Sequence, residues 1–336
     1  MQIHSAGDLK YRLPNSLSDF QIRMYIHLIN WKWKHITEEP GYYRGRPYDA
    51  LLPSSYKKEH YPIYRPIRDR FLEHQKKFKF KSQRFIGHMA SSQAACANLF
   101  LPIMEDPIVA AQILSVVKPD IRRVAIEYLD SGYRIEFWDE PGNMLNDHNK
   151  VTGTDSDFAI AYYDKQDGLN LWLIEHKLTE KEFTTCGGYK SKGRTIKHSC
   201  DSISEILRDA ELCYYHSACK YRYWPITVGS DLFSRMGEMS GECPFRGGLN
   251  QLWRNQLLGL AVENSPKWPF KKVFFSVVYH PKNESLVPTM REFGNLFNHD
   301  ERFSYFTSDR LLDAATKIDS ASISKWRSWY EELYFF

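Results

Sequence analysis

Two neighbouring stretches decide the fold of this chain: Thr152-Gly-Thr-Asp-Ser-Asp157-Phe-Ala-Ile-Ala-Tyr-Tyr163 and Leu169-Asn-Leu-Trp-Leu-Ile-Glu175-His-Lys177-Leu178. Each carries the apolar and aromatic residues that are typical of a strand, and the polar turn 164–168 joins them. They therefore predict an antiparallel hairpin. Because side chains alternate along a strand, Glu175 and Lys177 share one face of the second strand, at the end of an otherwise apolar run.

Asp157 begins the first strand of this hairpin after a Gly-containing bend, so we expect it to lie opposite Glu175. Two carboxylates at one point repel each other unless they share a divalent cation such as Mg²⁺ or Mn²⁺. Lys177 beside them can orient an attacking water or stabilise developing negative charge. These residues predict phosphodiester hydrolysis. An ion pair at the rim of a strand is the alternative, but Glu-x-Lys occurs only once in the chain and falls on this strand.

The 336-residue chain predicts one mixed α/β domain over 85–336, with a cysteine-rich, loop-rich insertion at 179–248, behind an extension over 1–84. A first hairpin is expected from 123–129 and 133–138, around the turn Asp130-Ser-Gly132. Apolar periodicity predicts a buried strand at 273–279 and helices near 86–102, 108–117, 202–211, 249–262, 291–297, 309–316 and 322–334.

The second half of the extension is basic and aromatic. Between Gly41 and Arg84 stand twelve basic and four acidic residues, so this segment carries +8 in a chain whose net charge is +4. Tyrosines and phenylalanines are interleaved with the charge, which is typical of an irregular arm that binds phosphates and stacks on bases. Lys76, Lys77 and Lys79 are its candidate DNA contacts. A solvated extension whose aromatic residues dock on the main body is the alternative.

Composition and the first residues argue against membrane and secreted proteins. The apolar runs are shorter than the ~20 residues that a membrane-spanning helix requires. The start of the chain lacks the basic and apolar regions of a secretion signal. We therefore expect a cytoplasmic protein without a membrane partner.

Five of the six cysteines lie within 58 residues of one another: Cys186, Cys200, Cys213, Cys219 and Cys243. In a reducing compartment such a group suggests metal or iron–sulfur ligation before it suggests disulfides. No Cys-x-x-Cys pair is present, which weakens a zinc-ribbon interpretation, although His198 and His216 are further candidates for a Zn²⁺ site. Buried free thiols are the alternative, and Cys96, in an apolar helix, is expected to be one.

At the hairpin residues the chain resembles the PD-(D/E)xK nucleases, the superfamily with the restriction-endonuclease-like fold. It is similar to a bacterial group of restriction endonucleases that carries Gly153-Thr-Asp-x-Asp157, Glu175-His-Lys-Leu-Thr-Glu180, Cys243-Pro-Phe-Arg-Gly-Gly248 and Gln251-Leu-Trp-Arg-Asn255. The resemblance spans about 85–336. It implies a restriction-endonuclease-like core, in which helices flank a central mixed sheet of about four to five strands.

The resemblance also implies roles for the hairpin residues. Asp157 and Glu175 would bind the metal, and Lys177 would be the catalytic lysine. The first core helix offers Ser91-Ser-Gln93 where many members of the superfamily have a Glu, so a second-metal ligand is missing there. Asp155 is the candidate to supply it.

The predicted helix at 249–262 carries further candidates. Gln251 keeps the place of the Gln in a Gln-x-x-x-Tyr pair that the exonuclease branch of the superfamily uses, with Asn255 in place of Tyr, so the resemblance makes Gln251 a candidate catalytic residue. Arg254 on the same stripe and Arg246 just before the helix are candidate DNA phosphate contacts. A polar helix face in solvent is the alternative, above all for Asn255.

Some nucleases of this superfamily hold a 4Fe–4S cluster with four cysteines that clamp peripheral segments to the core. The resemblance therefore implies such a cluster for four of the five grouped cysteines, with Zn²⁺ as the second choice. Cys243-Pro244 is similar to the end of many such sites. A site of this kind would be structural, because hydrolysis transfers no electrons.

The function expected from these residues is a Mg²⁺-dependent DNA endonuclease, of restriction or phage-defence type, whose basic extension grips DNA. An exonuclease or DNA-repair nuclease of the same fold with an iron–sulfur cluster is the second interpretation. A catalytically silent nucleic-acid-binding protein is the third. DNA is the expected partner, and a homodimer is the usual arrangement for an enzyme that cuts both strands.

Overall fold

The computed structural model describes residues 2–80, 86–149, 153–190, 200–297 and 301–336. The predicted start of the nuclease domain at residue 85, the first residue of the Thr152 motif and the zinc candidate His198 lie outside these ranges.

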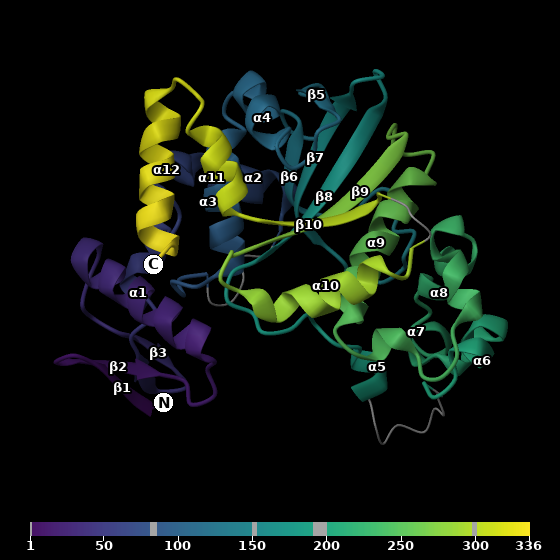
Figure 1. Cartoon of the computed structure of the whole chain (residues 1–336), viewed down its shortest axis with the longest axis horizontal. Helices are drawn as coiled ribbons and strands as arrows, with labels where there is room; N and C mark the ends of the chain where they lie inside the picture. The colour runs from purple at the N-terminus through teal and green to yellow at the C-terminus, as the bar shows by residue number, and fades with distance from the viewer. Residues whose placement is uncertain (1, 81–85, 150–152, 191–199, 298–300) are drawn as a thin grey trace.

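A mixed six-stranded sheet forms the centre of the described chain (Figure 1). Its strand order is β10-β9-β8-β7-β5, and β6 also pairs with β7. β7 runs antiparallel to β5, β6 and β8, whereas β8, β9 and β10 run parallel. The strands are β5 (Ile121–Val124), β6 (Tyr133–Phe137), β7 (Ser156–Asp164), β8 (Leu169–Lys177), β9 (Lys272–Tyr279) and β10 (Phe303–Thr307). The predicted α/β class and central mixed sheet are confirmed.

The predicted hairpin of β7 and β8 is confirmed, but the first predicted hairpin is wrong. β5 and β6 both pair with β7, one at each end of the same edge. The chain leaves this edge after Ala125, whose N–H donates to Ala161 O, and returns at Gly132, whose carbonyl accepts from the N–H of Ala161. Because β7 is nine residues long, its edge accommodates both short strands end to end.

Helices cover both faces of the sheet (Figure 1). One face packs against α3 (Ser92–Ile103), α4 (Pro107–Leu114), α11 (Asp309–Ala315) and α12 (Ala321–Tyr334). The other packs against α9 (Leu249–Glu263) and α10 (Val287–Gly294). Along β8, Trp172 and Ile174 enter the first apolar core whereas Leu171 and Leu173 enter the second, as the alternation predicts.

Capping residues set where these helices begin. Ser91 accepts from the N–H of Ala94, so α3 starts at Ser92 rather than near residue 86. Asp106 caps α4 just before Pro107, a residue that suits the first turn of a helix. These two helices therefore lie where their polar start signals stand, not where the apolar pattern first appears.

The N-terminal extension is folded and docked on the first core. α1 (Asp19–His35) begins with a capping box and packs against α12. Two small hairpins flank it, β1 (Gln2–Ala6) with β2 (Leu9–Leu13) and β3 (Gly41–Tyr43) with β4 (Arg46–Tyr48), and α2 (Arg68–Phe78) follows. Met24, Leu28 and Phe71 are buried in the same core as α3. The aromatic residues of the basic segment thus include core residues.

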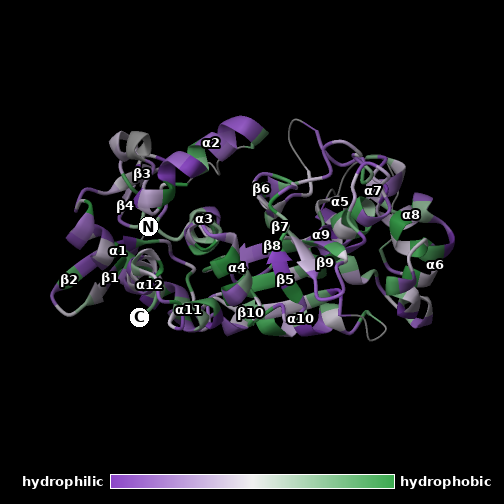
Figure 2. Ribbon diagram, turned by 90° about the horizontal axis from the view of Figure 1, so that it is seen from above, coloured by the Kyte–Doolittle hydropathy of each residue, from purple (hydrophilic) through white to green (hydrophobic). Residues whose placement is uncertain are grey.

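The cysteine-bearing segment between β8 and α9 consists of short elements: α5 (Gly187–Lys190), α6 (Ile203–Arg208), α7 (Tyr214–Ser217) and α8 (Tyr223–Val228). Short 3₁₀ segments complete the described secondary structure, at Ser54–Glu59, Arg65–Ile67, Ala210–Leu212, Asp231–Glu238, Pro244–Arg246 and Glu284–Leu286. Figure 2 shows hydrophobic residues concentrated in the central strands, whereas α2 at the edge is mostly hydrophilic.

Within the described ranges no single helix has the length and apolar content of a membrane span. The bent pair formed by α3 and α4, with 115° between its helices, meets that test by length and composition only.

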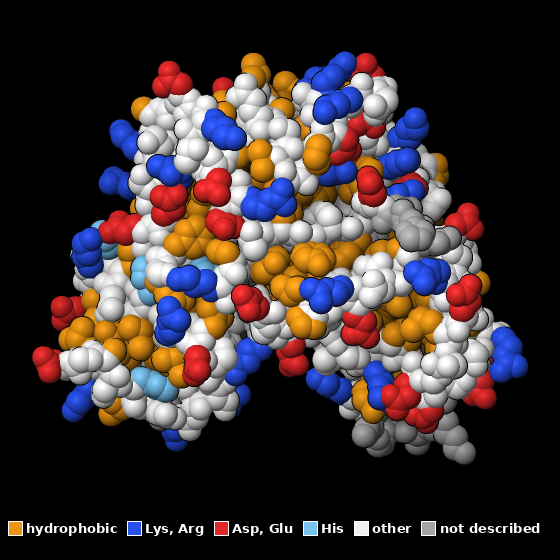
Figure 3. Space-filling model, in the orientation of Figure 1, with side chains coloured by type: hydrophobic (Ala, Val, Ile, Leu, Met, Phe, Trp, Pro, Cys, Tyr) orange, Lys and Arg blue, Asp and Glu red, His pale blue; other side chains and the backbone are white. Residues whose placement is uncertain are grey.

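Two lobes lie on either side of the end of the sheet where β8 finishes (Figure 1). One is the first part of the N-terminal extension, with α1, β1, β2 and β3, and the other is the cysteine-bearing segment, whereas α2 lies beside β6. Figure 3 shows that the surface is hollowed between these lobes, with Lys and Arg side chains on both walls. The hollow makes the end of β8 the place to look for a functional site.

Candidate active site

Three adjacent strands bring three carboxylates into line. The antiparallel register between β6 and β7 places Glu136 opposite Asp157. The register between β7 and β8, continued by one position, places Asp157 opposite Glu175. We call Glu136, Asp157 and Glu175 the carboxylate row. The expected juxtaposition of Asp157 and Glu175 is therefore present, and a third carboxylate joins it.

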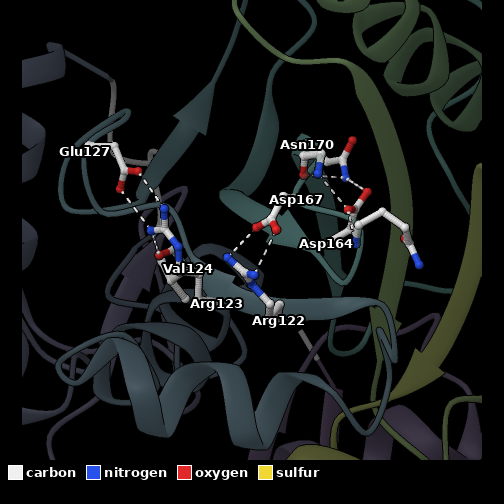
Figure 4. Close-up of polar contacts among 9 residues, drawn as sticks. Arg122, Arg123, Val124, Glu127, Asp164, Asp167 and Asn170 are labelled. Atoms are coloured by element: carbon white, nitrogen blue, oxygen red, sulfur yellow. Dashed lines mark hydrogen bonds and ion pairs between the residues drawn. The ribbon is translucent and has the colours of Figure 1, made fainter.

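The turn at the far end of the hairpin fixes this register (Figure 4). Asp164 accepts hydrogen bonds from the N–H of Gly168 at 2.8 Å and from Asn170 Nδ2 at 2.7 Å. Arg122 of β5 donates to Asp167 of the turn at 3.0 Å. A slip of one residue in the hairpin would carry Glu175 to the opposite face of the sheet, so the turn positions the carboxylate row from a distance.

Glu175 is held from three sides, and its side chain is only 4% exposed. Lys177 Nζ lies 2.8 Å from its Oε1, and Gln251 Nε2 donates to the same oxygen at 2.7 Å. Asn255 Nδ2 donates to Oε2 at 2.8 Å. Helix α9 therefore presents Gln251 and Asn255 to the strand rather than to solvent, and it fixes the orientation of the carboxylate.

Burial and neighbouring charges act together on the pKa of Asp157 and against each other on the pKa of Lys177. Burial, followed by the neighbouring charges of Glu175 and Glu136, holds the pKa of Asp157 well above its ordinary value. Lys177 and the N–H of His176, which donates to Asp157 Oδ2 at 2.7 Å, offset this effect only in part. Burial alone would lower the pKa of Lys177, but the attraction of Glu175 and other carboxylates raises it, so Lys177 is charged.

Glu136 is a residue that the sequence reasoning missed. Its backbone lies in the left-handed region with φ of 50°, and Gln93 Nε2 of α3 donates to its Oε1 at 2.7 Å. Burial, with Asp155 and Glu175 nearby, raises the pKa of Glu136 to about 8. Gln93 stands on the helix where a Glu was sought, and it holds a carboxylate supplied by β6 instead. The signal in the sequence was a Glu inside an apolar strand beside the hairpin.

Asp155, the candidate for a second-metal ligand, lies beside the carboxylate row and has another partner. Its Oδ1 is 2.9 Å from His148 Nε2, and the His148 ring stacks on Trp138 with centroids 3.8 Å apart. Asp155 acts on the row through its charge, since it contributes to the raised pKa of Glu136.

Arg254 holds the chain segment that leads into β7. Its Nη2 donates to Gly153 O at 2.8 Å and its Nε to Thr154 Oγ1 at 3.0 Å. Thr154 in turn donates to buried Asp147, which also accepts from Tyr223 OH of α8 at 2.7 Å. These bonds direct Arg254 toward the backbone just before Asp157, rather than toward a phosphate in solvent.

Comparison with protein families bears on these residues. Residues 30–335 match the family REase-ARP, described as restriction endonuclease associating with ARP. The chain belongs to this family. No curated protein and no solved structure in the same comparisons matches it. The resemblance to restriction endonucleases is thereby confirmed, and the carboxylate row with Lys177 lies in a protein of a restriction endonuclease family.

The other DNA-contact candidates of this restriction endonuclease family member lie at its surface. Lys76 and Lys79 are exposed at the end of α2. Lys77 forms an ion pair with Asp130 at 2.8 Å. Arg246 pairs with Glu242 and lies over the ring of Tyr189. A cavity of about 670 Å³ lies where the extension meets His88, and it is lined by Pro14, Asn15, Tyr43, Arg44, Arg46, Tyr48, Leu51 and His88.

No disulfide joins any of the six cysteines, all of which lie in the described ranges. Cys96 is buried in α3, as expected. Cys219 follows α7, and His216 faces Glu211 and the carbonyl of Tyr221. Among the residues that the structure describes, no group of three or more His, Cys, Asp or Glu side chains is placed to hold a metal ion as it stands.

Proposed function

We propose that this member of a restriction endonuclease family is a DNA endonuclease that depends on Mg²⁺ or Mn²⁺, with Asp157 and Glu175 as metal ligands and Lys177 as the catalytic lysine. The observation that carries the proposal is the hairpin register, which sets Asp157 beside the Glu175–Lys177 pair in a chain of this family.

The chemistry of these residues fits a divalent cation. Mg²⁺ is typically bound by one or two carboxylates and completes its shell with waters and phosphate oxygens, so Asp157 and Glu175 suffice as protein ligands. Burial, followed by the charges of Glu175 and Glu136, raises the pKa of Asp157, and a bound cation would oppose this effect. When bound, the cation would polarise the scissile phosphate and lower the pKa of a water.

The protein groups around the carboxylates have separate roles in this proposal. Lys177, charged and recessed, stabilises the negative charge that develops on the phosphate or orients the attacking water. Gln251 and Asn255 hold Glu175 in one orientation, because each donates to a different carboxylate oxygen. Arg254 holds the backbone before Asp157. Gln251 thus acts as a positioning residue for Glu175.

DNA would enter the hollow between the two lobes. The basic extension also carries Lys76 and Lys79, which are exposed at the end of α2 and can neutralise phosphates. One carboxylate row cuts one strand, so we propose that a homodimer cuts both. The family description, restriction endonuclease associating with ARP, supports our proposal that the protein acts in restriction of foreign DNA.

The test is cleavage of supercoiled plasmid and of end-labelled linear DNA with Mg²⁺, Mn²⁺ or Ca²⁺, together with DNA binding. Asp157→Asn is the decisive variant because it keeps the shape of the side chain and removes the charge. Lys165→Ala, in the exposed turn at the other end of the hairpin, is the matched control. We expect cleavage by the wild type and by the control with Mg²⁺ or Mn²⁺, and none by Asp157→Asn.

The same experiment separates the other functions. Digestion of linear DNA that spares closed circles would replace the endonuclease by an exonuclease. Binding without cleavage under every ion would contradict the proposal and favour the silent binding protein. Cleavage by Asp157→Asn at the wild-type rate would move the active site elsewhere.

A further inference from the structure

Four cysteines from separate parts of the chain meet in the cysteine-bearing segment. Cys186 precedes α5, Cys200 precedes α6, Cys213 precedes α7, and Cys243 precedes the turn Pro244–Arg246. The N–H of Cys243 donates to the carbonyl of Cys200 at 2.8 Å, which joins two of them directly. We call these four residues the cysteine group.

Backbone and ring contacts bring the remaining two members to the same place. The N–H of Cys186 donates to the carbonyl of Arg246, in the turn that follows Cys243, at 3.2 Å. On the other side, the N–H of Gly187 donates to Tyr215 OH at 2.9 Å. A Cβ at Gly188 would lie 3.2 Å from the ring of Tyr214, the residue after Cys213. The glycine thus allows α7 to approach Cys186.

The thiols lie close enough together that the charge of one affects the pKa of another. Burial, followed by the charges of Cys213 and Cys186, raises the pKa of Cys200 to about 11. Burial raises the pKa of Cys243, and Cys200, Cys213 and Cys186 each add to it. Cys186 is affected by Cys213 in the same way. Each of the four thiols therefore lies within electrostatic reach of the other three.

Backbone amides point at two of the sulfurs. The N–H of Tyr189 donates to Cys186 Sγ at 3.4 Å, and the N–H of Phe245 donates to Cys243. These bonds lower the thiol pKa against the effect of burial. Donors aimed at sulfur stabilise a thiolate, which is the form that binds metal.

The elements around the cysteine group are too short to be stable alone. α5, α6, α7 and α8 are four to six residues long, and isolated helices of that length are unstable in water. Ile203, Ile206 and Trp224 anchor α6 and α8 in the second apolar core, and a metal or a disulfide is a common further staple where such small elements need support. No disulfide joins the six cysteines, so a metal is the staple that these residues can support.

We infer that Cys186, Cys200, Cys213 and Cys243 bind a thiophilic metal centre, an iron–sulfur cluster or a zinc ion, which staples the cysteine-bearing segment together. In the described residues no group of Cys side chains is placed to hold an ion as it stands. The four side chains therefore turn toward one another when the metal binds. Each thiol releases its proton to solvent as its metal–sulfur bond forms. The centre is structural, so this inference does not depend on the nuclease activity.

The test uses the full chain purified without air, with iron, acid-labile sulfide and zinc measured per chain. We expect either about four irons with about four sulfides or about one zinc. Cys213→Ser and Cys243→Ser should lower that content at least about tenfold. Cys219→Ser, in the same segment but outside the cysteine group, is the matched control and should keep it.

A second measurement on the wild type covers the case in which the serine variants fail to fold. Removing the metal with a chelator should increase the number of thiols that react with a maleimide and lower the melting temperature, and adding the metal back should reverse both. The inference is overturned if the wild type, after reconstitution with iron and sulfide or with zinc, binds neither in stoichiometric amount. Equal loss of metal in Cys219→Ser and Cys213→Ser would overturn the assignment of ligands.

Discussion

The carboxylate row and the cysteine group are both clusters of like groups that repel one another when charged, yet the chain assembles them differently. The row stands on three hydrogen-bonded strands, and its geometry follows from strand register. The cysteine group stands on loops and very short helices, joined by a few backbone hydrogen bonds. The fold organises the carboxylate row, whose like charges repel each other, whereas we infer that a metal organises the cysteine group.

The largest effect should come from the lysine beside the row. Lys177→Ala should lower the single-turnover rate of DNA cleavage about 10²- to 10³-fold, because it removes the charge that faces the developing negative phosphate. Lys177→Arg keeps the charge but not the compact ammonium, so it should restore part of the rate. DNA binding in Ca²⁺ should change little. A wild-type rate in Lys177→Ala would show that the row acts without its lysine.

The parts of the fold and the site that could be predicted from the sequence are those that depend on neighbouring residues in the chain. The hairpin of β7 and β8 follows from alternation and a polar turn, so the juxtaposition of Asp157 and Glu175 could be predicted. Glu136 was missed because β6 was assigned to a hairpin with β5, and because its left-handed backbone breaks the alternation that sequence patterns assume. The edge with which a strand pairs depends on tertiary packing, and no local sequence pattern predicts it.

The partners of Glu175 show the same limit. Gln251 and Asn255 lie 76 and 80 residues away along the chain, and only packing of α9 against β8 reveals that they meet the carboxylate. Arg254, expected at a phosphate, instead donates to the loop before β7. The cysteine spacing likewise could not say which four of five converge. The periodicity of helices and strands predicts which residues share a face, but not which other elements that face contacts.

The next effect tests whether the two regions are mechanically linked. Tyr223 of the cysteine-bearing segment donates to buried Asp147, which also accepts from Thr154 before Asp157. Tyr223→Phe should lower the free energy of unfolding by about 1–3 kcal/mol, because it removes a donor to a buried carboxylate. Chemical denaturation measures this, with the exposed Tyr42→Phe as the control expected to change little. If Tyr223→Phe is as stable as the wild type, the hydrogen bond from Tyr223 does not link the two regions.

A smaller effect, on the melting temperature, should come from the electrostatic repulsion within the carboxylate row. The pKa of Glu136 is raised to about 8 in the folded chain, above its ordinary value of 4.5, so its contribution to stability is present at low pH and is lost as pH rises through 8. Without metal, Glu136→Gln should therefore melt a few degrees higher than the wild type at pH 9. Near pH 5 the two should agree. Thermal melts in EDTA across this range measure the difference, and a Gln variant that is less stable at pH 9 would contradict the proposed repulsion.

The smallest effect concerns the basic extension, where charge acts through solvent and not through a fixed contact. Lys76 and Lys79 are exposed, so replacing both with Ala should weaken DNA binding and reduce the slope of log affinity against log salt by about 0.9 for each phosphate that is no longer neutralised. Lys77 is already paired with Asp130, so Lys77→Ala should change the slope less. Titrations at several salt concentrations in Ca²⁺ distinguish them. If Lys77 proves as important as its neighbours, the ion pair with Asp130 must open on DNA, and the end of α2 would then share the adaptability inferred for the cysteine group.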